Sequence, residues 1–252
     1  MGQTESVVAV IPARWGSTRF PGKALAPLAG EPMIAHVVRR AAGARTVGRV
    51  LVATDDDRIA RAAAAAGAEA VMTGECPSGT DRVAEAMRAR ASDSDLVVNV
   101  QGDEPLLSGA NIDVLVEGLR ADTEVGMATL CRPLATEWVD DPNAVKVVVD
   151  GRRRALYFSR SAVPYPRNRE AARPLWRLHL GIYAFRREAL ERFVGLEPSP
   201  LERAEGLEQL RALENGIGIL VLDAPEDAFG VDTPEDLARV EELLRRSGGG
   251  TR

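Results

Sequence analysis

Short apolar runs alternate with amphipathic segments along the first 130 residues of the chain. Val7–Pro12 and Leu96–Gln101 are mostly apolar, as expected of strands that are buried on both faces of a sheet. Met33–Ala44 instead repeats its apolar side chains with a helical period. The pattern predicts two further strands, Val50–Thr54 and Glu69–Thr73, and three further helices, Asp57–Ala66, Asp81–Ala91 and Asn111–Ala121. Such alternation predicts an α/β fold with a mostly parallel central sheet and helices on both faces.

Beyond residue 125 the predicted strands follow one another more closely, which indicates a small antiparallel lobe spanning about residues 125–215. Its strands are predicted at Gly126–Cys131, Ala144–Asp150, Ala155–Ser159 and Leu178–Phe185, and Val163–Leu175 is predicted to be irregular because it holds three prolines. Helices are predicted at Arg187–Val194, Pro200–Leu213 and Thr233–Arg246, with a late strand at Ile217–Asp223. We expect one domain over residues 1–252, with a frayed tail at 247–252.

Composition excludes several classes of protein. The 252 residues are 45% hydrophobic and 27% charged, which is typical of a globular chain and not of a disordered or fibrous one. No apolar run approaches the roughly 20 residues of a membrane span, and no secretory signal is visible. The net charge of −5 argues against nucleic acid or an anionic membrane as a partner. Two cysteines without a CxxC spacing favour reduced thiols and a cytoplasmic location.

The loop after the first predicted strand concentrates positive charge and glycine. Residues 13–23 read ARWGSTRFPGK and follow the carboxyl end of a parallel strand, where open α/β sheets bind ligands. Glycines let backbone N–H groups approach phosphate oxygens, and arginine and lysine neutralise the phosphate charge. The spacing matches neither a P-loop nor a GxGxxG fingerprint. Only Lys23 and Lys146 are lysine among 32 basic residues, so a retained lysine is itself informative. We interpret the loop as a triphosphate-binding site.

Two acidic segments end other predicted strands. Asp103 in VNVQGDEP could bind Mg²⁺ together with substrate phosphates, or could cap the turn before the next helix. Asp232 in GVDTPED resembles a helix N-cap with Glu235 completing a capping box, a role that leaves room for metal binding. The run Asp55–Asp57 resembles the DxD metal-binding motif of glycosyltransferases, but capping of the following helix explains it more simply.

The two histidines do not indicate nucleophilic catalysis. His36 falls near the apolar face of a predicted helix and is expected to pack in the core. His179 shares a strand face with Gly181 and Tyr183, without the context of a nucleophile elbow.

Ten segments in order resemble the 3-deoxy-manno-octulosonate (KDO) cytidylyltransferases over residues 6–245. The segments are VIPARWGSTRFPGK, VATDD, SGTDRVAEA, VNVQGDEPL, GMATL, DPNAVKVVVD, ALYFSR, HLGIYAF, PSPLERAEGLEQLRALENG and GVDTPEDL. The resemblance implies a Rossmann-like nucleotidyltransferase fold, a homodimer, Mg²⁺ dependence and a role in lipopolysaccharide synthesis. It also implies transfer of CMP from CTP to KDO with release of pyrophosphate.

The resemblance also implies a set of site residues. The nucleotide would be bound by Ala13, Arg14, Gly16, Ser17, Arg19 and Lys23. Asp103 and Asp232 would hold the magnesium ion and, with Arg14 and Lys23, carry the catalysis. The acceptor would be bound by Gln101, Arg160, His179, Tyr183, Glu208 and Gln209.

Two departures from the family pattern lie near the acceptor side. Cys76-Pro77 stands where many members have His-Gln, and Leu178 stands where Arg or Lys is common. We therefore keep open CMP transfer to another small acid, such as phosphonoformate, and a catalytically silent CTP-binding paralogue. Such a paralogue would be expected to have lost Lys23 or the two carboxylates, which are present.

Overall fold

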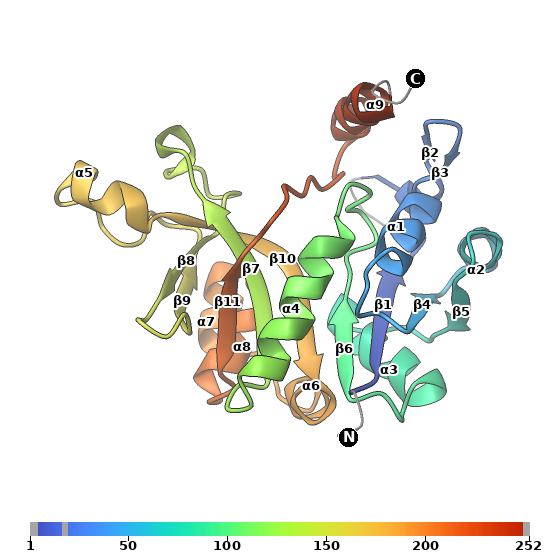
Figure 1. Ribbon diagram of the computed structural model, residues 1–252, viewed down its shortest axis with the longest axis horizontal. Coiled ribbons are helices and arrows are strands. Elements are labelled where there is room, and N and C mark those ends of the chain that lie inside the picture. Colours follow the sequence, from blue (N-terminus) through green and yellow to red (C-terminus); the bar gives the residue numbers. More distant parts are fainter. Residues whose placement is uncertain (1–4, 17–19, 249–252) are drawn as a thin grey trace. The chain divides into compact units, whose positions relative to one another are not determined.

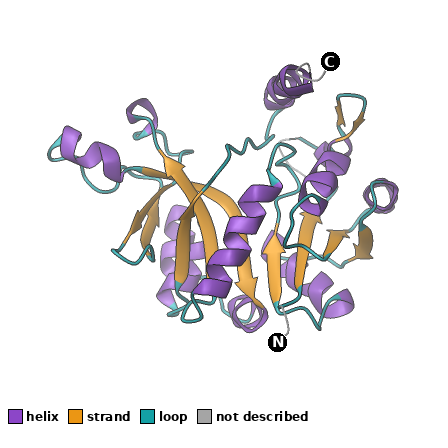
Figure 2. Cartoon of the chain, in the orientation of Figure 1, coloured by secondary structure: helices purple, strands orange, loops and turns teal. Residues whose placement is uncertain are grey.

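The computed structural model describes residues 5–16 and 20–248, and their contacts divide into two compact units. The first unit comprises residues 1–113 and 226–252, and the second comprises residues 114–225. The expected lobe at about 125–215 falls inside the second unit, and the single-domain interpretation stays a prediction. Figure 2 shows the mixture of helices and strands that the alternation predicted. The α/β fold class is confirmed.

The first unit is built on four parallel strands in the order β6-β1-β4-β5 (Figure 1). Their bounds are Val7–Ala13 for β1, Arg49–Thr54 for β4, Glu69–Met72 for β5 and Leu96–Asn99 for β6. Residues 8–11 of β1 are fully buried, as a central parallel strand requires. A separate two-stranded sheet pairs β2, Pro27–Leu28, with β3, Glu31–Pro32.

Helices of the first unit follow the strands much as predicted. They are η1 Lys23–Leu25, α1 Met33–Ala42, α2 Asp57–Ala65, α3 Gly79–Arg90 and α9 Pro234–Gly248. The helix α4, Gly109–Ala121, contains the boundary between the units. Val231 and Val240 pack with Leu28 and Met33, which brings the C-terminal segment against the start of α1. That packing holds the loop before α9 in place.

The second unit contains β7 Met127–Pro133 paired in parallel with β11 Ile219–Asp223 and antiparallel with β10 Arg177–Arg186. The hairpin of β8, Lys146–Val149, and β9, Ala155–Ser159, adds antiparallel strands beside β10, as the close spacing of the predicted strands indicated. The remaining helices are η2 Thr136–Trp138, α5 Arg169–Ala172, η3 Arg173–Leu175, α6 Arg187–Val194, α7 Pro200–Glu205 and α8 Gln209–Glu214.

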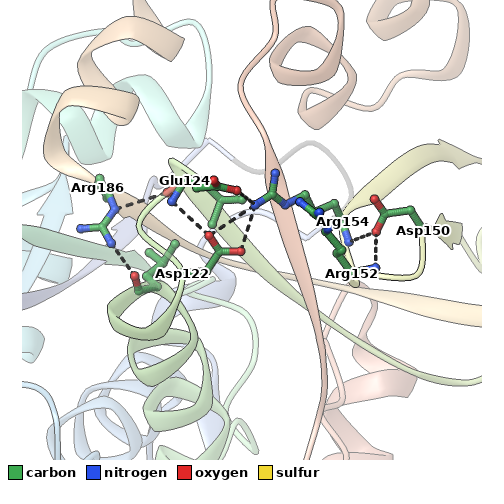
Figure 3. Close-up of polar contacts among 8 residues, drawn as sticks. Asp122, Glu124, Asp150, Arg152, Arg154 and Arg186 are labelled. Atoms are coloured by element: carbon green, nitrogen blue, oxygen red, sulfur yellow. Dashed lines mark hydrogen bonds and ion pairs between the residues drawn. The ribbon is translucent and has the colours of Figure 1, made fainter.

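A charged cluster ties the β8–β9 hairpin to the segment that follows α4 (Figure 3). The Arg154 guanidinium lies 2.6 Å from Glu124 Oε2 and 3.3 Å from Asp122 Oδ2. Arg186, at the end of β10, donates to the carbonyl oxygens of Leu119 and Val125. These contacts hold the segment between α4 and β7 in place within the second unit.

Three local predictions are wrong. The helix expected over Pro200–Leu213 is two helices, because Gly206 adopts a left-handed conformation (φ 63°) that ends α7. The irregular stretch Val163–Leu175 contains α5 and η3. The cap of α9 is displaced by one residue from the predicted pair Asp232 and Glu235. Thr233 Oγ1 accepts from the backbone N–H of Asp236, and the Asp236 carboxylate accepts from the N–H of Thr233.

Candidate nucleotide site

A pocket of about 330 Å³ opens at the carboxyl ends of β1 and β6 within the first unit. Its lining is mainly polar and comes from loops that follow these strands and from the start of α3. The lining residues are Pro12, Ala13, Arg14, Lys23, Ala24, Cys76, Pro77, Ser78, Gly79, Arg82, Gln101, Gly102, Asp103 and Asp232. The strand-end position predicted for a ligand site is therefore the position of a pocket.

The ammonium of Lys23 is the central charge of this pocket. It lies 2.5 Å from Asp103 Oδ2, 3.5 Å from Asp232 Oδ1 and 3.1 Å from the carbonyl oxygen of Val231. Exposure rises from the lysine side chain (18%) to Asp103 (30%) and Asp232 (49%), so the carboxylates face the open side of the pocket. The Val231 N–H donates to the Asp103 carbonyl at 2.8 Å, which joins the two acidic loops.

The two carboxylates suit a magnesium ion by their chemistry. Magnesium is commonly held by about one or two carboxylates, with substrate phosphates and water completing its oxygen ligands. Asp103 and Asp232 are such a pair and converge on one cationic group. Across residues 5–16 and 20–248, no group of three or more His, Cys, Asp or Glu side chains could hold a metal ion.

Glycine is required where the loop after β6 passes β1. A Cβ atom built on Gly102 would lie 2.8 Å from the carbonyl oxygen of Pro12, closer than real Cβ atoms approach. The glycine of the QGDEP segment therefore lets the Asp103 loop pass close to the end of β1.

The remaining predicted nucleotide residues differ in how far the structure describes them. Ala13 and Arg14 line the pocket, and the Arg14 side chain is exposed. Gly16 is described but is not among the lining residues. Ser17 and Arg19 lie outside the described residues.

Arg82 is a pocket residue to which the sequence analysis assigned no role. Its side chain is 5% exposed, and its guanidinium donates to Thr73 Oγ1 and, at 3.0 Å, to Asp55 Oδ2. The sequence did contain a signal for this residue, namely an arginine on the face of α3 that is buried. A buried charge requires a partner or a ligand. Here the partners come from the ends of β4 and β5.

Glu104 is the second carboxylate of the acidic pair in the QGDEP segment. Burial, with a further contribution from Asp103, raises its pKa to about 8. Its Oε2 atom is buried and has no hydrogen-bond partner in the described part of the chain. Burial therefore favours the neutral form of this carboxyl group beside Asp103.

Within the acidic run Asp55–Asp57, Asp56 caps α2 and Asp57 lies in its first turn, which agrees with the predicted capping role. The Asp56 side chain accepts from the Arg58 N–H at 2.9 Å. His36 Nε2 lies 2.8 Å from the Leu28 carbonyl, in keeping with the packed position expected for it.

Five of the six predicted acceptor residues lie in the second unit, whereas Gln101 lines the pocket of the first. His179 and Tyr183 lie together on β10, with ring centroids 5.5 Å apart. The His179 Nε2 atom is 3.0 Å from Thr129 Oγ1, and burial lowers the His179 pKa to about 3. His179 is therefore a neutral hydrogen-bonding group at neutral pH.

Arg160 lies against the turn between α7 and α8. Its side chain donates to the carbonyl oxygens of Glu205 (2.7 Å) and Pro142 (2.9 Å). Lys146, which is fully buried, donates to the carbonyl oxygen of Arg160 at 2.5 Å. The second lysine of the chain therefore has a structural contact at the end of β9.

Glu208 and Gln209 begin α8. Glu208 occupies the N-cap position with helical dihedral angles, and Gln209 is 2% exposed. The Gln209 Nε2 atom has no hydrogen-bond partner among the described residues. A buried amide donor without a partner is costly, and a hydrogen-bond acceptor at this position would remove that cost.

A parallel sheet whose strand ends carry a cationic loop and paired carboxylates defines an α/β nucleotidyltransferase fold. The sequence profile of the family described as "Cytidylyltransferase" matches residues 8–221. The chain is 53% identical over 238 residues to a 3-deoxy-manno-octulosonate cytidylyltransferase of Anaeromyxobacter dehalogenans (strain 2CP-C), covering 94% of this chain and 97% of that protein. The corresponding Escherichia coli protein is 46% identical and is matched over 95% of its length, again with 94% of this chain.

A solved structure agrees with these relatives. It is of CMP:2-keto-3-deoxy-manno-octonic acid synthetase complexed with CTP, with a TM-score of 0.91 and 44% identity, covering 96% of this chain and 99% of that one. The chain belongs to the cytidylyltransferase family, and the resemblance to the KDO cytidylyltransferases is confirmed. No helix in residues 5–16 and 20–248 is long and apolar enough to cross a membrane.

Proposed function

We propose that this protein transfers CMP from CTP to KDO, giving CMP-KDO and pyrophosphate. The observation that carries the proposal is the convergence of Lys23, Asp103 and Asp232 in one strand-end pocket. Its relatives over nearly the whole chain are named for this reaction. Those names favour KDO over the phosphonoformate alternative, and the three retained charged groups argue against a silent paralogue.

In the proposed reaction the anomeric hydroxyl of the sugar acid attacks the α-phosphorus of CTP in line, and pyrophosphate leaves. Arg14 and Lys23 bind the triphosphate and stabilise the charge that develops on the departing pyrophosphate. Arg19 and Ser17 belong to the same proposal through the family pattern. The reaction needs no covalent enzyme intermediate, because the acceptor hydroxyl is itself the nucleophile.

Magnesium is the proposed cofactor, held by Asp103 and Asp232. When bound it would neutralise phosphate charge and favour ionisation of the attacking hydroxyl. The carboxylates also orient Lys23, whose flexible stem would let its ammonium follow the phosphate oxygens.

The acceptor is proposed to bind through Gln101, Arg160, His179, Tyr183, Glu208 and Gln209. Neutral His179, fixed by Thr129, would offer the sugar a hydrogen bond without adding charge. A C8 sugar acid has enough hydroxyl groups to use most of this set, whereas a compact phosphono acid does not.

The test is pyrophosphate release with CTP, ATP or GTP, Mg²⁺ and KDO, followed by a competition between KDO and phosphonoformate at limiting CTP. We expect strong preference for CTP and a CMP adduct on KDO, identified by mass. Equal release from all nucleotides would contradict the cytidylyl assignment. An adduct on phosphonoformate alone would replace the acceptor and keep the nucleotide.

We also propose a homodimer formed through an apolar surface of the second unit. Trp138, Tyr165 and Leu175 are large apolar side chains that are 56%, 83% and 56% exposed. Their chain neighbours Val139 and Trp176 share one core cluster, and the Pro164 carbonyl accepts from the Trp176 indole. Exposed apolar side chains grouped in this way are typical of interaction surfaces.

Sedimentation velocity tests the dimer. The Trp138→Ser/Leu175→Ser variant is expected to sediment as a monomer, whereas the control Leu201→Ser, at an exposed apolar position on α7, should remain dimeric. A dimer that survives the double substitution would exclude this surface.

We also propose that the protein is cytoplasmic and that its product, CMP-KDO, is used in lipopolysaccharide synthesis. Both cysteines, Cys76 and Cys131, are free thiols, in keeping with a reducing compartment. Cell fractionation with an antibody to the protein would test the location.

A further inference from the structure

The acidic run Asp55–Asp57 makes contacts that helix capping does not require. Asp55 does not cap α2, and its carboxylate bridges two other elements. Oδ1 accepts from the backbone N–H of Trp15 at 3.2 Å, and Oδ2 accepts from the Arg82 guanidinium at 3.0 Å. Asp55 therefore joins the first residues of the cationic loop to a side chain that lines the pocket.

The Trp15 ring is held from one side by α2. The Arg58 guanidinium carbon lies 3.5 Å from the ring centroid, in the geometry of a cation–π contact. Arg58 is itself fixed by Asp56, whose two carboxylate oxygens accept from Arg58 Nε at 3.0 Å and Nη2 at 2.6 Å. A chain of contacts therefore runs from the cap of α2 to the indole.

The other end of the cationic loop returns to Trp15. The Gly22 N–H donates to the Trp15 carbonyl oxygen at 3.0 Å, which brings the two ends of the loop together. Gly22 has φ +71°, and a Cβ atom there would lie 2.7 Å from Trp15 Cη2. The indole therefore covers Gly22, directly before Lys23, while Arg14 lies directly before the indole.

We propose that Trp15, clamped by Asp55 and Arg58, is a positioning residue for the triphosphate loop. The clamp fixes Trp15 and, through the Gly22 N–H, the residue directly before Lys23, and so sets the positions of Arg14 and Lys23. The inference rests on the proposed function, because it assigns the loop to CTP. In this proposal Trp15 makes no contact with the reacting atoms.

The clamp has a specific kinetic consequence. If the loop is correctly placed in only a fraction of molecules, the apparent Kd for CTP rises by the reciprocal of that fraction. If, in a variant without the clamp, Arg14 and Lys23 are correctly placed in about one tenth of the molecules, the apparent Kd for CTP of that variant is about 10-fold higher than that of wild type. Once CTP is bound it selects the placed loop, so kcat at saturating CTP stays near the original value.

The experiment compares wild type with Trp15→Ala, Trp15→Phe and Arg58→Ala, using Arg61→Ala as the matched control. Arg61 lies on the same helix, is exposed and carries the same charge. CTP affinity is measured by calorimetry without acceptor, and kcat and both KM values by pyrophosphate release. Thermal melting confirms that each variant is folded.

We expect Trp15→Ala and Arg58→Ala to raise the Kd and KM for CTP about 5- to 10-fold, with kcat within 2-fold and the KM for KDO unchanged. Trp15→Phe, which keeps a ring, should recover part of the affinity, and Arg61→Ala should match wild type. A Trp15→Ala/Arg58→Ala double variant should bind CTP no more weakly than Trp15→Ala alone, because both substitutions break the same contact.

Two results would overturn the clamp: CTP affinity within 2-fold of wild type in both Trp15→Ala and Arg58→Ala, or a uniform loss of kcat and melting temperature that Trp15→Phe does not restore. Failure of the wild-type protein to bind CTP or release pyrophosphate would instead refute the proposed function. The two failures are therefore distinguishable.

Discussion

Asp232 and Thr233 are adjacent, yet the structure predicts opposite consequences for their substitution. The cap of α9 belongs to Thr233 and Asp236, whose side chains accept from each other's backbone N–H groups at 3.2 and 2.9 Å. The Asp232 carboxylate is instead 3.5 Å from Lys23 Nζ at the pocket. Asp232→Asn should therefore impair catalysis with little loss of stability, and Thr233→Ala should do the reverse.

The magnitudes follow from these contacts. Removing a threonine N-cap costs about 1 kcal/mol, which corresponds to a fall in Tm of roughly 2–4 °C for a chain of this length. Asp232→Asn weakens a half-exposed ion pair, worth at most about 1 kcal/mol, and keeps the backbone contact of residue 232 with Asp236. Loss of one of two proposed metal carboxylates should lower kcat/KM at least about 100-fold, or about 2.7 kcal/mol of transition-state stabilisation.

The assay pairs differential scanning fluorimetry with pyrophosphate release over a range of Mg²⁺ concentrations. Asp232→Asn should need more Mg²⁺ for half-maximal activity, whereas Thr233→Ala should keep wild-type Mg²⁺ dependence. Turnover near wild type in Asp232→Asn, with a lowered Tm, would refute the reasoning. Asp232 would then be a structural residue of the α9 start.

Three further predictions concern stability. Burial lowers the pKa of His179 in the folded protein to about 3, whereas its ordinary value is 6.5. Below pH 6.5 the unfolded chain therefore binds a proton at His179 and the folded chain does not. The free energy of unfolding should thus fall as pH drops from about 6.5 toward 4, by at most about 1.4 kcal/mol per pH unit, and His179→Asn should flatten that dependence in urea titrations. Arg211→Met should destabilise the protein by about 3 kcal/mol in the same titration, because it strands the Glu202 carboxylate, whose side chain is 13% exposed. Gly206→Ala should cost about 1 kcal/mol by denaturant unfolding, since residue 206 has φ +63°.

Each of these has a comparison that isolates the cause. Parallel pH curves for wild type and His179→Asn would contradict the lowered pKa. Arg203→Met, at an exposed position on α7, is the control for Arg211→Met and should leave stability nearly unchanged. For Gly206, an unchanged midpoint in the alanine variant would show that the turn relaxes without strain.

Local sequence determined the elements. Apolar runs located the four parallel strands of the first unit to within two residues at each end, because side chains buried on both faces leave a continuous apolar signal, whereas the short pair β2 and β3 was not predicted. The density of arginine, lysine and glycine at 13–23 also marked the ligand edge of the sheet. Two of the failed predictions have local causes: the left-handed Gly206 divides one predicted helix, and the cap of α9 is displaced by one residue to Thr233.

Which charged groups meet depends on the packing of segments that are far apart in the chain. Lys23 and Asp232 are separated by 209 positions, and no local pattern states that they lie 3.5 Å apart. The same holds for Asp55, whose two carboxylate oxygens join Trp15 to Arg82 across three segments of the chain. Periodicity and propensity report the burial of each segment by itself. The partner of a charge depends on how the sheet brings distant strand ends together, and that is a property of the packed fold.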